Sequence, residues 1–264
     1  MKRNIYKLAV SALVVAFAMT ATAAVAAPNP DGANFNLRIF DDCFTSTLNT
    51  TNNYPALVQI DDDWNCLNGW ANLHNWHLSE GGAEVEFDNA DGWEFAFDLV
   101  LSGPDNMEAG MQIAPWWSQD VDGRFNIRST DGEIACFGGR LPFYSFTAND
   151  GINYVKGETI GLKAIYCPNS LDSLDAGTIE YIVNYGGSTY SSGPLAFSEG
   201  NPSEDPPHGL WGLLTPHKVG GYVQTHLGGP GGQAIATYTN ITYSNKATTA
   251  TENTSWGEVK SLFR

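Results

Sequence analysis

The segment WEFAFDLVL, Trp93 to Leu101, alternates large apolar side chains with smaller or charged ones. Successive side chains of a β-strand point to opposite faces of the sheet. The odd-numbered residues, from Trp93 through Phe95 and Phe97 to Leu101, therefore share one face, and Glu94 and Asp98 share the other. This pattern predicts a strand with one buried face.

The same alternation recurs from Glu84 onward, and no long helical period competes with it. It places inward Val85, Phe87, Phe125, Ile127, Ile179, Tyr181, Val183 and Tyr185. Segments such as DNADG (88–92) and GGPGGQ (228–233) are typical of tight turns. Trp64, Trp70 and Trp76 fall in a region interpreted as loops. We expect an all-β fold, with one large sandwich or barrel.

The two ends of the chain differ from this pattern. Residues 1–26 carry three cations, a short apolar run and an Ala24-Val25-Ala26 cleavage pattern, which together predict an export signal peptide. Residues 27–245 form the expected sandwich domain. Residues 246–264 are interpreted as a Thr-rich spacer and a short amphipathic helix. This tail either packs on its own domain or docks to an envelope or export partner. No transmembrane span is expected in the mature form.

Charge limits the partners. Removal of the leader takes three of the 13 Lys and Arg residues and none of the 29 Asp and Glu residues, which leaves a net charge of −19. Such a chain repels nucleic acid and anionic membrane surfaces. A secreted or periplasmic protein that binds a glycan fits the composition, which is rich in glycine and aromatic residues.

The four cysteines, Cys43, Cys66, Cys136 and Cys167, have no C-x-x-C spacing and belong to a chain predicted to be exported. Two disulfides are therefore favoured over a metal site. Short separations favour Cys43 with Cys66 and Cys136 with Cys167, and the other two pairings remain open.

The segment from Asp61 to Gly103, with its acidic start, its Gly-Trp and its GGAEVEF strand, resembles the opening of secreted concanavalin A-like lectin/glucanase (laminin-G-like) sandwiches. The following EAGMQI and DGRFNIRS segments resemble the next strands, and the resemblance covers about residues 35–244. It implies a two-sheet antiparallel β-sandwich of jelly-roll type, one sheet often carrying a ligand groove. It does not imply a reaction.

The stretch MQIAPWWSQDVDGRFNIR, Met111 to Arg128, suggests a sugar-binding surface. Alternation assigns Trp117 to the core with Met111 and Ile113, and Trp116 to the outer face. The predicted ligand-binding residues on that face are Trp116, Gln112, Arg124, Asn126 and Arg128. An aromatic ring among amides and guanidinium groups is typical of sugar recognition. The alternative is a solvated face or a Trp covered by a loop.

For catalysis, the candidates are Glu84, Glu86 and Asp88, which alternate along EVEFD. The acids of laminarinase-type glycosidases have the pattern E-x-D-x-x-E, and here the middle acid is Glu and the last is missing. We therefore expect a non-catalytic carbohydrate-recognition protein. The alternatives are a polysaccharide hydrolase or lyase, and a structural or adhesive surface protein.

Two features suggest calcium binding, and one is the run of carboxylates from Asp61 to Asp63, which supplies hard oxygen ligands. Asp120 and Asp122 have the spacing of two positions of a calcium loop, but serines replace its other key ligands. The histidines show no paired metal spacing. Calcium is the one cofactor that the sequence suggests.

Overall fold

The structure is a computed structural model that describes residues 27–66, 69, 71–113, 123–138, 141–198, 211–213, 216–226 and 232–246. The strands are β1 (Gly32–Asp41), β2 (Thr47–Asn53), β3 (Leu57–Trp64), β4 (Ala71–Glu80), β5 (Ala83–Glu84), β6 (Gly92–Ser102), β7 (Met107–Ile113), β8 (Gly123–Arg128), β9 (Ile134–Phe137), β10 (Tyr144–Ser145), β11 (Ile160–Cys167), β12 (Thr178–Tyr185), β13 (Ser188–Ala196), β14 (Val219–His226) and β15 (Gly232–Lys246). One short helix, α1 (Phe146–Asp150), is described. Within the described ranges, no helix is long and apolar enough to cross a membrane.

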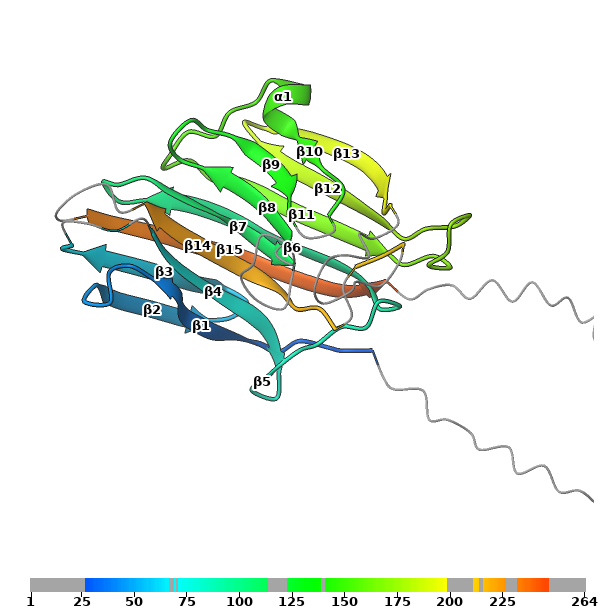
Figure 1. Cartoon of the computed structure of the whole chain (residues 1–264), viewed down its shortest axis with the longest axis horizontal. Helices are drawn as coiled ribbons and strands as arrows, with labels where there is room; N and C mark the ends of the chain where they lie inside the picture. Colours follow the sequence, from blue (N-terminus) through cyan, green and yellow to red (C-terminus); the bar gives the residue numbers. More distant parts are fainter. Residues whose placement is uncertain are drawn as a thin grey trace, which may run out of the picture.

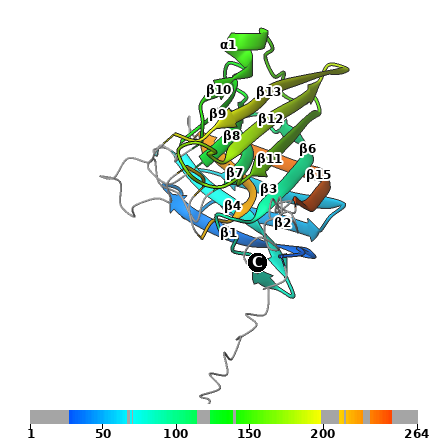
Figure 2. The ribbon, with the colours of Figure 1, turned by 90° about the vertical axis from the view of Figure 1, so that its right-hand side faces the viewer.

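The strands form two antiparallel sheets stacked as layers (Figures 1 and 2). Sheet A has the order β1-β4-β14-β7-β8-β9-β10, with β5 paired to β4. Sheet B has the order β13-β12-β11-β6-β15-β3-β2. The predicted all-β antiparallel sandwich, which the resemblance to the concanavalin A-like family implies, is confirmed. The predicted C-terminal helix lies outside the described residues.

The core lies between the sheets and follows the alternation of β6. Its five inward side chains, from Trp93 to Leu101, are at most 2% exposed. The Phe97 ring meets the Tyr238 ring edge-on at 5.0 Å, and the Trp76 ring meets the same tyrosine at 5.4 Å. Burial of such aromatic side chains, each worth about 1.5–3 kcal/mol, is the main force that holds the sheets together.

The loop interpretation around the tryptophans is wrong. Trp64 ends β3, Trp76 lies within β4, and both are fully buried. Trp70 lies outside the described residues. Strand β4 escaped prediction because nine of its ten residues are buried, polar ones included, so that no apolar alternation marks it.

The EVEFD segment differs in another way. Val85 and Phe87 are buried as predicted, but only Ala83–Glu84 is a strand, and Phe87 makes an isolated bridge to His217.

One of the two predicted disulfides is present, between Cys43 and Cys66. The predicted Cys136–Cys167 pair is wrong, since both cysteines are free. Cys136 in β9 is buried in the core. Cys167 is the last residue of β11 and follows Tyr166, whose side chain is buried in the core. Alternation along the strand therefore turns the Cys167 side chain outward. The Cys136 thiol therefore lies between the sheets and the Cys167 thiol lies on the outer side of sheet B, a difference that a short sequence separation does not reveal.

Candidate functional site

The outer side of sheet A carries a row of buried polar side chains, whereas the outer side of a sandwich sheet ordinarily meets water. The strands involved are β4, β14, β7 and β8, which lie side by side in Figure 1. We call this set the polar face: Asn75, His77, Glu108, Gln112, Arg124, Asn126, Tyr222 and Gln224. Each of its members is at most 9% exposed. The side chains of the polar face are therefore buried and are not solvated.

Strand register explains why these residues meet. Across the sheet, Asn75 pairs with Tyr222, Tyr222 with Gly110, and Gly110 with Asn126. A side chain at Gly110 has no room, because a Cβ there would lie 1.9 Å from the carbonyl oxygen of Phe125. The Tyr222 side chain therefore reaches over Gly110, and its hydroxyl donates to Asn126 Oδ1 at 2.9 Å.

The neighbouring row links β4 to β7 in the same way. His77 pairs with Gly220, Gly220 with Gln112, and Gln112 with Arg124. Asn75 Nδ2 donates to Gln112 Oε1 at 2.5 Å and so ties the two rows together.

Arg124 occupies the charged end of the polar face. Its guanidinium donates to Glu108 Oε1 at 2.6 Å and to Gln224 Oε1 at 3.1 Å. It also lies 4.7 Å from the centre of the Tyr222 ring, a cation–π contact. The ion pair fixes the guanidinium and keeps the face close to electrically neutral at this end.

At the other end of the polar face, Glu84 of β5 holds the His77 ring. Its Nδ1 lies 3.0 Å from Glu84 Oε1, and Asn36 and Lys218 also donate to the Glu84 carboxylate. The hydrogen bond from His77, aided by Lys218 and Asn36, outweighs burial and holds the pKa of Glu84 well below its usual range. The ionised carboxylate is an acceptor that draws the Nδ1–H of His77, so Nε2 of the neutral ring is an acceptor; Asn36 Nδ2 lies 3.1 Å from the same Nδ1.

Three buried atoms of this face have no hydrogen-bond partner: Asn75 Oδ1, His77 Nε2 and Asn126 Nδ2. Leaving such a group unsatisfied costs about 1–3 kcal/mol. Native proteins rarely keep a cluster of them without a reason. The cluster therefore marks the part of the described structure best suited to bind a polar ligand.

The structure brings together three of the predicted ligand residues, Gln112, Arg124 and Asn126. Arg128, the fourth, ends β8 and pairs with Asp131 at 2.6 Å and Glu133 at 2.9 Å. Trp116, Asp120 and Asp122 lie outside the described residues. Asn75, His77 and Tyr222 were not predicted.

The acidic candidates do not form a catalytic set. Glu84 is paired with Lys218 and His77, whereas Glu86 has a side chain 58% exposed and Asp88 lies in an exposed turn. A general acid needs a raised pKa, and that of Glu84 is lowered. Glu94 and Asp98, the other acids with outward side chains in the sequence pattern, belong to β6 of sheet B and not to sheet A.

No cluster of three or more His, Cys, Asp or Glu side chains suited to a metal ion occurs among the described residues. Asp61 to Asp63 are described and form no such cluster, and the calcium prediction at Asp120 and Asp122, outside the described residues, remains a prediction.

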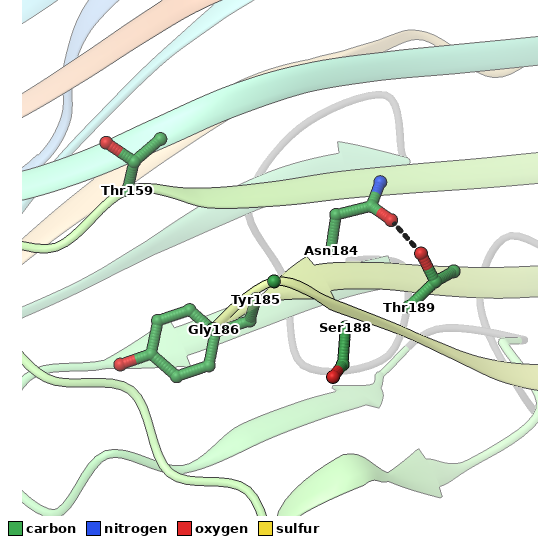
Figure 3. A pocket seen from close by; sticks show the side chains of 7 residues that line it. Thr159, Asn184, Tyr185, Gly186, Ser188 and Thr189 are labelled. Atoms are coloured by element: carbon green, nitrogen blue, oxygen red, sulfur yellow. Dashed lines mark hydrogen bonds between the residues drawn. The ribbon is translucent and has the colours of Figure 1, made fainter.

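A separate pocket of about 320 Å³ lies at the β12–β13 hairpin (Figure 3). It is lined by Thr159, Asn184, Tyr185, Gly186, Gly187, Ser188 and Thr189. Thr189 donates to Asn184 at 2.7 Å, and the Tyr185 ring points away from that pair. The pocket is open, and none of the side chains that line it has a buried polar atom without a hydrogen-bond partner, so it is the weaker candidate.

No family model and no curated relative matches the chain. Among solved structures, lectin I from Ulex europaeus in complex with the methyl glycoside of α-L-fucose is 10% identical, with a TM-score of 0.44 over 81% of this chain and 92% of that one. A functionally unknown protein from Saccharomyces cerevisiae is 10% identical, with a TM-score of 0.42 over 76% and 96%. An alginate lyase from Corynebacterium sp. is 10% identical, with a TM-score of 0.38 over 73% and 82%. These similarities are too low to bear on function, and the sandwich assignment rests on the sheet topology itself.

Proposed function

We propose that this chain is an exported, non-catalytic carbohydrate-recognition protein whose ligand binds at the polar face of sheet A. The observation that carries the proposal is the cluster of three buried, unpartnered polar atoms on Asn75, His77 and Asn126. Ligand hydroxyls would satisfy these atoms and so remove the free-energy penalty of leaving them unpaired.

The chemistry of the face suits a sugar. Asn and Gln amides, an Arg guanidinium and a Tyr ring present planar hydrogen-bonding groups beside an apolar surface. Sugars offer both hydroxyl and C–H groups in close alternation, so each kind of side chain finds a partner. Trp116 is proposed as a stacking platform beside this face.

Export is supported by the Cys43–Cys66 disulfide, since such bonds persist mainly in oxidising compartments. The leader pattern of residues 1–26 points to the same destination.

A second candidate function, cleavage of a polysaccharide, has one observation in its favour. His77 has its Nδ1 held by a carboxylate and its Nε2 unpartnered, which is the arrangement of a general base. Incubation of the mature protein with a panel of polysaccharides distinguishes the two functions. Release of new reducing ends or unsaturated products, abolished by His77→Phe, would establish the enzyme.

The test of binding uses the mature chain, residues 27–264, in affinity electrophoresis through gels that contain single polysaccharides. We expect at least one gel to retard the protein, and the Gln112→Leu variant to run freely in it. The matched control is Asn184→Leu in the pocket of Figure 3, which keeps the retardation. Loss of retardation in the control alone would move the site to sheet B.

A further inference from the structure

We infer that the ligand of the polar face is a neutral polysaccharide, recognised through its hydroxyl groups, and not a uronate or sulfated polymer. The inference rests on the proposed function and adds the chemical class of the ligand. Two independent features of the face carry it: the kind of hydrogen bond that each unpartnered atom offers, and the state of the nearby charges.

The unpartnered atoms are two acceptors and one donor. Asn75 uses its Nδ2 on Gln112, so its free atom is the carbonyl oxygen. The Nδ1–H of His77 faces Glu84, so its free atom is the Nε2 lone pair. Asn126 accepts the Tyr222 hydroxyl with Oδ1, so its free atom is the Nδ2 donor.

A sugar hydroxyl donates one hydrogen bond and accepts others, so it can match all three atoms. A carboxylate or sulfate group only accepts. Placed at this site, it would match Asn126 and would set its lone pairs against Asn75 Oδ1 and His77 Nε2. The two acceptors therefore favour hydroxyl donors at this position and disfavour a carboxylate or sulfate group there.

The charges beside the face are already matched within the protein. Arg124 is paired with Glu108, and Lys218 is paired with Glu84 and lies 3.8 Å from Glu86. An anionic ligand would have to break one of these pairs, which leaves a buried carboxylate without its partner. The whole chain carries a net charge of −16, which repels a polyanion before contact.

The test measures affinity by calorimetry for neutral polymers (glucans, mannans and galactans) and for acidic ones (alginate, polygalacturonate and a sulfated galactan). We expect binding to a neutral polymer and affinities at least about tenfold weaker for the acidic ones. His77→Phe, which keeps a ring and removes the acceptor, should weaken neutral binding by about tenfold or more. Asn126→Ala should do the same, and Asn184→Ala on sheet B is the matched control.

Each outcome has a separate meaning. Preference for an acidic polymer overturns the inference and leaves the proposed function standing, whereas failure of every polymer to bind overturns both. Unchanged neutral affinity in both variants, each melting as a folded protein, removes these atoms from the site. Where one variant fails to fold, the other decides.

Discussion

At the scale of single residues, two histidines three positions apart in β4 show how one strand serves both sides of sheet A. His77 faces outward, whereas His74 faces the core and is fully buried. His74 Nδ1 accepts the backbone N–H of Arg38 at 2.9 Å, so its proton is on Nε2, which donates to Asp62 Oδ2 at 3.4 Å. Asn72 and Thr225 donate to the same oxygen, at 2.9 and 3.2 Å.

This buried carboxylate predicts acid sensitivity. Burial raises the pKa of Asp62, but the hydrogen bonds from His74 and Asn72 outweigh it, and the pKa is lowered. A carboxyl whose folded-state pKa is lowered stabilises the fold above its unfolded value, about 4, and loses that contribution as the pH falls. We expect the free energy of unfolding, measured by urea titration, to decrease between about pH 5 and pH 3. Asp62→Asn should reduce this dependence, to which Glu84 also contributes because its pKa is lowered, and an unchanged slope would exclude Asp62 as a source.

The twin tryptophans predict a second contrast between neighbours. Met111 and Ile113 are buried in the core and Gln112 lies on the polar face, as the alternation requires. Continued along the sequence, that alternation predicts that Trp117→Ala lowers stability by about 3–5 kcal/mol. Trp116→Ala should leave stability nearly unchanged and weaken glycan binding by about 1–2 kcal/mol. Melting temperature and affinity, measured on both variants, check this, and the reverse pattern would exchange the two roles.

At the scale of elements, alternation was sufficient for some strands and not for others. Strand β6, with apolar side chains on one face only, could be predicted residue by residue. Strand β4 could not, because Asn72 and His74 are buried polar residues on its core side and Asn75 and His77 are buried polar residues on its outer side. Two of the polar-face residues missed from the sequence, Asn75 and His77, lie on this strand, since the polarity that suits them for a site also hides the strand. Gln112, Arg124 and Asn126 were found because β7 and β8 keep an apolar inner face.

The cysteines give a prediction at the same scale. Removing the Cys43–Cys66 bond, by Cys43→Ala with Cys66→Ala, should lower the free energy of unfolding by about 2–4 kcal/mol, because the unfolded chain regains freedom. The control is Cys136→Ala with Cys167→Ala, which removes no disulfide. Alkylation of the unreduced, denatured protein should label two thiols. In the native protein Cys136 should stay unlabelled, since it is buried and burial raises its pKa. If no cysteine of the unreduced, denatured protein is alkylated, all four are in disulfides and the Cys136–Cys167 bond exists after all.

At the scale of the whole molecule, an acidic chain carries a nearly neutral polar face. The net charge of −16 is spread over the sequence, whereas the cations beside the polar face are each opposed by a carboxylate: Arg124 by Glu108, Lys218 by Glu84 and Arg128 by Asp131. Long-range charge therefore repels anionic polymers, and under the proposed function short-range hydrogen bonds select among uncharged ones.

This division predicts how binding responds to salt. If neutral hydroxyl groups make the contacts, no ion pair forms between protein and ligand, and screening has nothing to weaken. A roughly tenfold rise in ionic strength should then change the affinity for the neutral polysaccharide by less than about twofold. Residual binding of an acidic polymer should instead strengthen with salt, because screening reduces its repulsion from the acidic chain. Calorimetry with both polymers at low and high salt measures this. A neutral affinity that falls steeply with salt would show that a charged side chain, Arg124 or Lys218, leaves its carboxylate to bind the ligand.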